Sequence, residues 1–173
     1  MISSLFDSTT MALLLASRLR SPLGELLVAS RGPALCGLWF VDQAGIPAWA
    51  LEAPAPSDMP PVLRATQQQL QGYFSGHLRA FDLPLDIVEG TVFQREVWAA
   101  LARIPYGQTT SYGQIAAALG RPRAVRAVGG AVGRNPLGIV LPCHRVLGRN
   151  GSLTGYTGGL DRKRALLRLE GTD

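Results

Sequence analysis

Two short helices joined by a tight turn are the pattern that most limits the folds open to this chain of 173 residues. Ser111 is a favourable N-cap, and Gln114 follows it by three residues, which is the spacing of a capping box. The helix that begins there is predicted to end at Gly120, and residues 121–123 lead into a second helix over 124–133. The pattern predicts a helix-turn-helix whose second helix carries arginines at its start, as a recognition helix does.

The net charge of +5 comes from the half of the chain that contains this motif. Residues 1–90 contain five Arg and eight Asp or Glu, whereas residues 91–173 contain twelve Lys or Arg and four Asp or Glu. A basic half beside an acidic half indicates a polyanionic partner for the second half. On charge alone, a basic surface without any such partner is the alternative.

The first half predicts a small mixed α/β domain over residues 1–89. Apolar runs over 13–20, 24–30 and 35–41 predict an antiparallel meander, because a turn signal separates the first two. Side chains at near-helical spacing predict a helix over 62–75 that ends at Gly76.

The remaining segments of the first half carry weaker signals. Residues 81–87 alternate apolar and polar side chains around Pro84, as an edge strand does. Residues 1–11 are predicted to form a loose tail and residues 44–61 a loop. Cys36 lies in an apolar strand pattern that favours core packing.

The second half, residues 90–173, is predicted to be mostly helical. Thr91 is an N-cap candidate for a helix that runs to about residue 101, and residues 162–169 form a basic amphipathic pattern. The whole chain is therefore placed in the α+β class: a mixed α/β N-terminal domain is followed by a winged helix-turn-helix-like C-terminal domain.

Cysteine usage and hydropathy indicate a compartment. Cys36 and Cys143 are too few for a disulfide framework, and a free thiol fits a reducing compartment. The apolar run at 11–16 has no basic segment before it and is too short to span a membrane. We expect a cytoplasmic protein without a membrane partner.

The sequence Pro-Cys-His-Arg-Val at 142–146 carries the most reactive side chain of the chain. A free thiol has a pKa of about 8.5, and only the thiolate is a good nucleophile. His144 and Arg145 are both candidates for promoting ionisation of Cys143, and a third group would orient the histidine. Neighbouring side chains on an extended backbone point apart, so direct contact between Cys143 and His144 is not expected. A buried, unreactive Cys143 is the alternative.

The chain resembles the O6-alkylguanine-DNA alkyltransferases, also called methylated-DNA–protein-cysteine methyltransferases. The resemblance covers about residues 90–170 and rests on the order and spacing of several blocks. These blocks are Gly-Thr-Val-Phe-Gln at 90–94, Ile-Pro-Tyr-Gly at 104–107, Ser-Tyr-Gly-Gln-Ile-Ala at 111–116, Ala-Val-Arg-Ala-Val-Gly at 124–129, Asn-Pro at 135–136, the 142–146 block, and Gly-Tyr-Thr-Gly-Gly-Leu at 155–160. The resemblance implies a ribonuclease-H-like fold for the first domain.

The resemblance also implies roles at the reacting atoms. Cys143 is the alkyl acceptor, Glu170 orients His144, and His144 takes the thiol proton through a water molecule. Tyr112 helps to rotate the nucleotide and protonates the departing guanine, while Asn135 holds the segment that leads to the cysteine. The implied wall of the substrate pocket consists of Val146, Gly155, Tyr156 and Thr157, and Thr157 is placed to bond the guanine oxygen.

A flipped nucleotide and a duplex partner follow from the same resemblance. The alkyl group on guanine O6 cannot be reached inside a stacked duplex, so the nucleotide is turned out, and Arg126 fills the gap. The smooth helix after Arg126 fits the minor groove and predicts binding with little sequence preference. The implied DNA-binding residues are Arg126, Ala127, Gly129, Gly130, Ser111 and Thr110. Val132 stands where many bacterial relatives carry Asn.

The implied reaction is the repair of O6-methylguanine, with O4-methylthymine as a further substrate, in double-stranded DNA. One molecule accepts one alkyl group irreversibly, works as a monomer and needs no cofactor or metal. Residues 1–90 offer only Cys36 and His77 as soft metal ligands, which disfavours a zinc site there. A winged-helix regulator with strong sequence preference and a cysteine hydrolase that turns over repeatedly are the alternatives.

Overall fold

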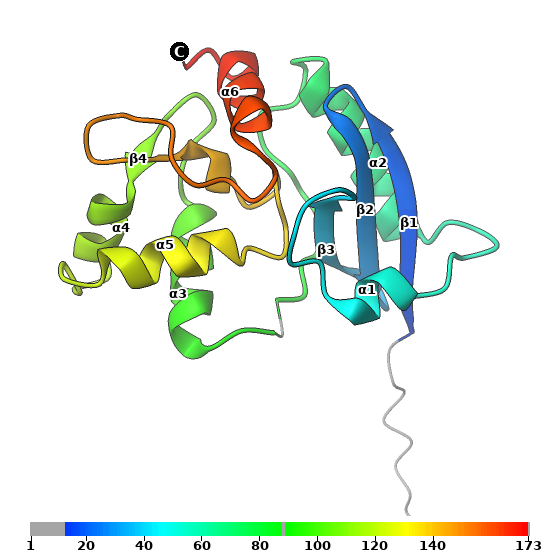
Figure 1. Ribbon diagram of the computed structural model, residues 1–173. Coiled ribbons are helices and arrows are strands. Elements are labelled where there is room, and N and C mark those ends of the chain that lie inside the picture. The colour runs from blue at the N-terminus through cyan, green and yellow to red at the C-terminus, as the bar shows by residue number, and fades with distance from the viewer. Residues whose placement is uncertain (1–12, 88, 173) are drawn as a thin grey trace, which may run out of the picture.

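The computed structural model describes residues 13–87 and 89–172. The tail predicted at residues 1–11 lies outside the described residues. Figure 1 shows two regions side by side. The sheet with α1 and α2 forms one region, α3, α4 and α5 belong to the other, and α6 lies above the junction between them. No helix within the described ranges is long and apolar enough to cross a membrane.

The first region contains the predicted meander. Strands β1 (Leu14–Ser21), β2 (Gly24–Arg31) and β3 (Ala34–Phe40) form an antiparallel sheet in that order. The turn between β1 and β2 closes where Ser21 Oγ donates to Gly24 O at 2.6 Å. At this turn Gly24 adopts a φ of 122°, a conformation that suits glycine.

Both faces of the sheet are covered. Alternate residues of β2 and β3, among them Val28 and Leu38, enter the main core, which α2 (Pro61–Phe74) covers. The other face carries Leu27 and Cys36 into a smaller cluster under α1 (Ala48–Glu52). Cys36 is thus buried as predicted, and burial raises the pKa of its thiol to about 11.

Two predictions for this region need correction. The segment 44–61 is not entirely loop, because it contains α1, whose Ala50 and flanking Trp49 close the smaller cluster. The segment 81–87 is not a full strand: it pairs with β3 through one parallel bridge, Leu35 with Leu85. Pro84 cannot donate a ladder hydrogen bond, which limits the pairing there.

The second region has the predicted helices. They are α3 (Val92–Leu101), α4 (Tyr112–Ala118), α5 (Val125–Gly133) and α6 (Leu160–Leu169). Thr91 with Gln94 and Ser111 with Gln114 form complete capping boxes, which set where α3 and α4 begin. Helix α5 packs against both α3 and α4, and the turn between α4 and α5 completes the helix-turn-helix.

Short elements carry the segment around Cys143. A 3-10 helix, η1 (Cys143–Arg145), is followed by β5 (Val146–Leu147), which pairs in parallel with β4 (Thr110–Ser111). This pairing holds the start of α4 beside the cysteine segment, although the two are more than thirty residues apart in the sequence.

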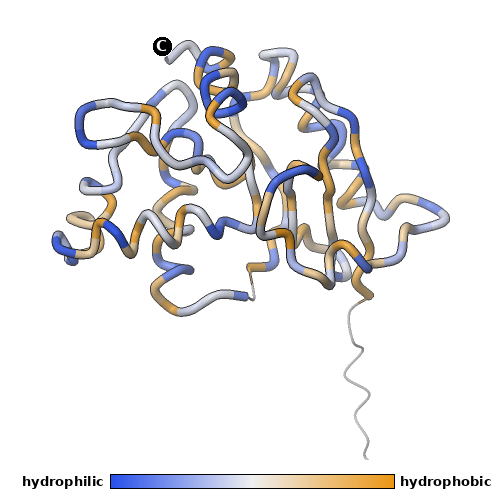
Figure 2. Tube along the Cα trace, in the orientation of Figure 1, coloured by the Kyte–Doolittle hydropathy of each residue, from blue (hydrophilic) through white to orange (hydrophobic). Residues whose placement is uncertain are grey.

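The two regions share one hydrophobic core. Buried side chains from β2, β3 and α2 pack with those of α3, α5 and α6 in one cluster. Figure 2 shows hydrophobic residues recurring along the strands and along the segments between the sheet and the helices. Backbone hydrogen bonds continue the junction, since Leu38 donates to Pro136 O at 2.8 Å and Gly138 donates to Leu38 O at 3.0 Å.

Arg162 on α6 fastens the second region to the sheet. Its guanidinium binds both carboxylate oxygens of Asp42, at 2.7 and 2.9 Å, and its Nε donates to Leu23 O at 2.8 Å. The same group lies 4.1 Å from the ring centroid of Phe40 and donates to Gly158 O at 3.1 Å. The helix predicted as basic and amphipathic therefore uses one of its basic side chains, Arg162, as a structural contact.

Gly37 provides a test of the sheet packing. A Cβ at this position would lie 2.0 Å from the Trp39 ring, so Gly37→Ala forces the ring out of its place. We expect a loss of about 1–3 kcal/mol in the free energy of unfolding, measured by urea denaturation. Gly113→Ala is the control, because the added Cβ would lie 3.9 Å from its nearest neighbour, Ser111 Oγ. The stability of this variant is expected to be unchanged or higher. Equal stability of Gly37→Ala and the unmodified protein contradicts the packing described.

Candidate active site

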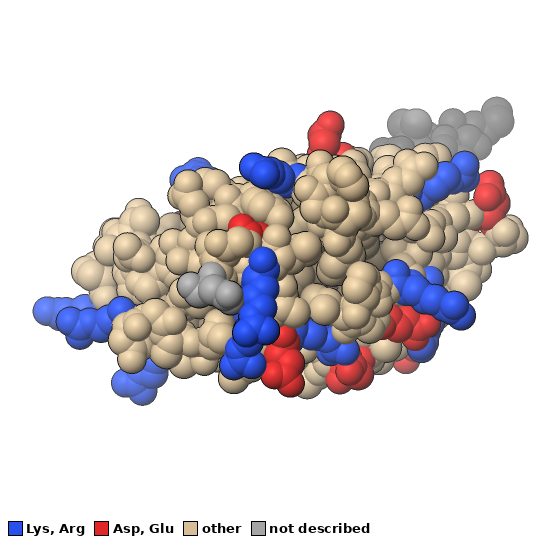
Figure 3. All heavy atoms as spheres, turned by 90° about the horizontal axis from the view of Figure 1, so that it is seen from above, with Lys and Arg blue, Asp and Glu red and all other residues tan. Residues whose placement is uncertain are grey.

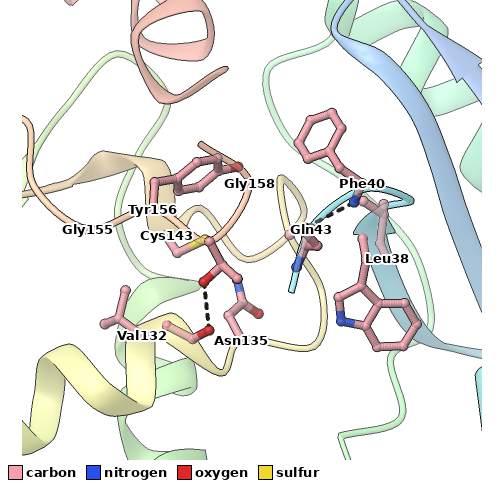
Figure 4. Close-up of a pocket in the computed structure, with 13 residues that line it drawn as sticks. Leu38, Phe40, Gln43, Val132, Asn135, Cys143, Gly155, Tyr156 and Gly158 are labelled. Carbon is pink, nitrogen blue, oxygen red and sulfur yellow. Dashed lines mark hydrogen bonds between the residues drawn. The ribbon is translucent and has the colours of Figure 1, made fainter. Parts of the chain in front are cut away.

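Cys143 opens onto a small cavity between the two regions. The thiol is at the start of η1 and its residue is 9% exposed. The cavity has a volume of about 20 Å³, enough for one water molecule. Its walls from the first region are Leu38, Trp39, Phe40 and Gln43, and those from the second are Val132, Gly133, Asn135, Gly138, Cys143, Gly155, Tyr156, Thr157 and Gly158. Figure 4 shows Cys143 facing Phe40 and Gln43 across this space.

The surroundings of Cys143 have opposing effects on the pKa of its thiol. Burial raises the pKa of the thiol, because a thiolate loses solvation in the protein interior. A hydrogen bond from Asn135 and the charge of Lys163 partly offset that effect. The resting side chain is therefore a thiol that ionises when a base takes its proton.

Lys163, and not Arg145, is the cation that favours the thiolate. Lys163 is fully buried, and its Nζ donates to Val146 O at 2.5 Å and to Thr154 O at 2.9 Å. Burial lowers the pKa of Lys163 to about 8, against the opposing charge of Cys143. Of the two candidates for promoting ionisation of Cys143, Arg145 does not have this role, since its guanidinium binds Glu170.

Glu170 lies at the centre of a buried network. Its side chain is inaccessible to solvent, and its Oε1 lies 2.8 Å from His144 Nε2. Arg145 donates from Nε to Oε2 at 2.8 Å and from NH2 to Oε1 at 3.0 Å. Burial opposes ionisation of Glu170, but hydrogen bonds from His144 and Arg145 outweigh it and hold the pKa at about 2.

This network determines which nitrogen of His144 is free. An ionised carboxylate only accepts hydrogen bonds, so the proton of the neutral imidazole belongs on Nε2. Burial lowers the pKa of His144, although the Glu170 hydrogen bond works against this shift, and the ring stays neutral. Nδ1 is buried and has no partner among the described residues, which leaves it as an acceptor.

The backbone geometry at 143–144 differs from the prediction. Cys143 and His144 are in a 3-10 helix, not in an extended segment, because Arg145 N donates to Pro142 O at 3.0 Å. The argument from alternating side chains therefore does not apply. His144 Nε2 points to Glu170.

Asn135 supports the segment before the cysteine as the resemblance implied. Its Nδ2 donates to Leu141 O at 2.7 Å, and its Oδ1 accepts from Leu137 N at 2.9 Å. These bonds close a compact turn in which Ile139 has a φ of 69°, unusual for a β-branched residue. The turn places Cys143 against the amide of Asn135.

The expected pocket residues are only partly assembled. Gly155, Tyr156 and Thr157 line the cavity, whereas Val146 is absent from its walls because its side chain is fully buried in the core. The hydroxyl of Thr157 donates to Gly133 O at 2.9 Å. That of Tyr112 is within hydrogen-bonding distance of Thr154 O and Gly155 O, at 3.0 and 3.2 Å. Both hydroxyl groups therefore bind the protein in this structure.

The expected DNA-binding residues share one end of the molecule. Arg126 and Ala127 are exposed on α5, and Gly129 and Gly130 are partly exposed there. Ser111 caps α4, and Thr110 Oγ1 donates to Gln114 Oε1 at 3.3 Å. In Figure 3 the helical end, on the left, shows only Lys and Arg among its charged groups, whereas Asp and Glu appear toward the centre and the sheet.

Three site residues were not found from the sequence in these roles: Arg145, Lys163 and Tyr73. The Tyr73 hydroxyl donates to Glu170 Oε1 at 2.6 Å. Lys163 precedes Leu166 and Leu167 by three and four residues, so the helical spacing already placed it on the buried face. Tyr73 follows Leu70 by three residues and carried no signal beyond that of a core aromatic.

Comparison with known proteins accounts for both regions. Residues 14–87 match the family model described as 6-O-methylguanine DNA methyltransferase, ribonuclease-like domain, and residues 92–172 match the DNA binding domain of the same name. The chain belongs to the 6-O-methylguanine DNA methyltransferase family. The predicted membership and fold are therefore confirmed.

Individual members of this family are similar over most of the chain. The methylated-DNA–protein-cysteine methyltransferase of Mycolicibacterium paratuberculosis is 50% identical over 153 residues, which are 87% of this chain and 88% of the relative. The crystal structure of the Mycobacterium tuberculosis O6-methylguanine methyltransferase superposes with a TM-score of 0.81 at 46% identity, covering 91% and 93% of the two chains. A structure of Mycobacterium tuberculosis OGT in complex with DNA gives 0.79 at 47% identity, covering 88% and 90%.

The buried carboxylate predicts an acid-sensitive fold. The pKa of Glu170 is about 2 in the folded protein and 4.5 in its unperturbed state, so its stabilisation is complete above pH 4.5 and is lost as the pH falls toward 2. This shift corresponds to about 3 kcal/mol. Urea unfolding between pH 2.5 and 6 should show this decline, and Glu170→Gln should be less stable at pH 6 with a shallower dependence on pH. An unchanged slope in the variant contradicts the assignment.

Proposed function

We propose that this protein repairs O6-methylguanine in DNA by moving the methyl group to the sulfur of Cys143. The observation that carries the proposal is a buried thiol facing a cavity between the two regions, beside a His144–Glu170 pair, in a chain of this family. The second substrate that we propose, O4-methylthymine, presents the same kind of alkyl-oxygen bond.

The proposed reaction is an in-line displacement at a saturated carbon. Glu170 holds His144 with its proton on Nε2, and Nδ1 accepts the proton of Cys143 through a water molecule. The thiolate attacks the methyl carbon, a carbon–sulfur bond forms, and the bond between that carbon and O6 breaks. Guanine leaves with the electron pair of that bond and takes a proton from Tyr112. Tyr112 can do so after its hydroxyl leaves the carbonyl groups of Thr154 and Gly155.

Helix α5 and the cavity wall provide the proposed route by which the substrate enters. The helix-turn-helix places α5 in the minor groove, where the small exposed surface of Ala127, Gly129 and Gly130 allows close approach. Arg126 enters the stack as the damaged nucleotide turns out toward the cavity. Thr157 bonds the guanine oxygen once its hydroxyl is released from Gly133. Because these contacts distinguish few base pairs, binding should depend little on the DNA sequence.

The product sets the stoichiometry. A thioether is not displaced under mild conditions, and Cys36 is buried in a different cluster, so no second thiol can take the methyl group from Cys143. We therefore propose one repair per molecule, by a monomer that works in the cytoplasm without a cofactor. A cysteine hydrolase would instead turn over repeatedly.

Intact mass after incubation with duplex DNA containing O6-methylguanine tests the acceptor. The unmodified protein should gain one methyl group per chain and no more, and Cys143→Ala should gain none. Cys36→Ala is the matched control and should gain one, because its thiol is buried away from the cavity. An unchanged mass of the unmodified protein, or methylation of Cys143→Ala, would remove the proposal.

The role of Arg126 is tested by comparing two substrates. Arg126→Ala should slow methyl transfer from duplex DNA by about tenfold or more, since a charged contact that holds the opened stack is lost. Transfer from free O6-methylguanine, which needs no flipping, should stay within about twofold. Arg18→Ala on the sheet removes the same charge elsewhere and should slow neither reaction. Equal slowing with both substrates contradicts a role in flipping.

A further inference from the structure

A residue of the ribonuclease-like domain reaches into the reactive network. Tyr73 lies on α2 and is fully buried, and its hydroxyl donates to Glu170 Oε1 at 2.6 Å. The same oxygen lies 2.8 Å from His144 Nε2, and the Tyr73 oxygen is 3.5 Å from that nitrogen. The phenol therefore contacts the atoms that fix the imidazole.

Glu170 depends on several donors for its orientation. Arg145 binds both of its oxygens, and Gly107 N lies 3.4 Å from Oε2. Of the described residues that donate to this carboxylate, only Tyr73 comes from residues 14–87. Its bond to Oε1 is the shortest of the set, so it strongly restricts rotation of the carboxylate about its last bond.

The hydroxyl contributes more than filling a core position. The Tyr73 ring packs edge to face with Phe74 and with Tyr106, and at a tilt against Phe81, with centroids 5.4 to 6.2 Å apart. A phenylalanine would make these same contacts. What tyrosine adds is a proton that stays on the oxygen, because burial and then the charge of Glu170 raise its pKa well above the usual range. It therefore remains a donor to the ionised Glu170 at neutral pH.

We propose that Tyr73 is a positioning residue for alkyl transfer: its hydroxyl fixes the Glu170 carboxylate so that His144 keeps its proton on Nε2 and presents Nδ1 as the acceptor for the thiol proton. This inference rests on the proposed function, and it deepens that function by making the ribonuclease-like domain a part of the reactive site. When the hydroxyl is removed, Oε1 loses its shortest hydrogen bond, and the oxygen that holds the imidazole is less firmly fixed.

The test compares Tyr73→Phe with Tyr106→Phe. Tyr106 belongs to the same aromatic group, but its hydroxyl donates to Leu169 O at 3.0 Å and not to Glu170. Under single-turnover conditions with O6-methylguanine duplex, Tyr73→Phe should react about tenfold or more slowly, since a hydrogen bond to a charged group is lost. It should still end at one methyl group per chain, and Tyr106→Phe should stay within about twofold of the unmodified rate.

Nitrogen-15 NMR of the histidine rings separates positioning from packing. The chain has two histidines, and His77 is exposed, so a His77→Gln background leaves His144 as the only ring observed. The unmodified network should show a protonated Nε2 and an unprotonated Nδ1. Tyr73→Phe should shift these two signals toward a mixture of tautomers, whereas Tyr106→Phe should leave them unchanged.

Each result has a defined meaning. A rate of Tyr73→Phe within twofold of the unmodified protein, equal slowing by both variants, or slowing without any change in the His144 signals would overturn the positioning role. Failure of the unmodified protein to gain a methyl group would instead overturn the proposed function. In that case the NMR comparison still decides whether Tyr73 fixes the imidazole.

Discussion

The site depends on an ionised carboxylate whose side chain is inaccessible to solvent. Glu170 remains charged only because Tyr73, His144 and Arg145 all donate to it. These donors come from α2 and from η1, while Glu170 itself follows α6, so the network forms only when these segments are packed together. The chemistry of Cys143 therefore requires the complete fold, although the cysteine and its histidine are neighbours in the sequence.

Burial decides the starting state of every reactive group. Burial keeps Cys143 as a thiol and His144 as a neutral ring. It also lowers the pKa of Lys163 to about 8. A nucleophile that ionises only when its base acts is protected from chance oxidation and alkylation.

The sequence predicted those helices and strands that depend on residues close together in the chain. The N-cap at Thr91 and the capping pair at Ser111 predicted the starts of α3 and α4, and the apolar spacing predicted α2 and the meander. What the sequence could not give was the partner of a side chain. Arg145 was one of two candidates for promoting ionisation of the thiol, and it binds Glu170. Val146 was assigned to the pocket and lies in the core. Tyr73 is 97 residues from its partner, a pairing that spacing within one helix cannot reveal.

The two ranges matched by the family models share one hydrophobic core. They divide the chain between residues 87 and 92, yet Leu38 and Leu137 are bridged across that division, and Arg162 joins α6 to the sheet. Severing the chain there would expose two complementary apolar faces to water. The division between the two matched ranges therefore does not divide the hydrophobic core. A substitution that changes side-chain volume at this junction disturbs the packing of both regions.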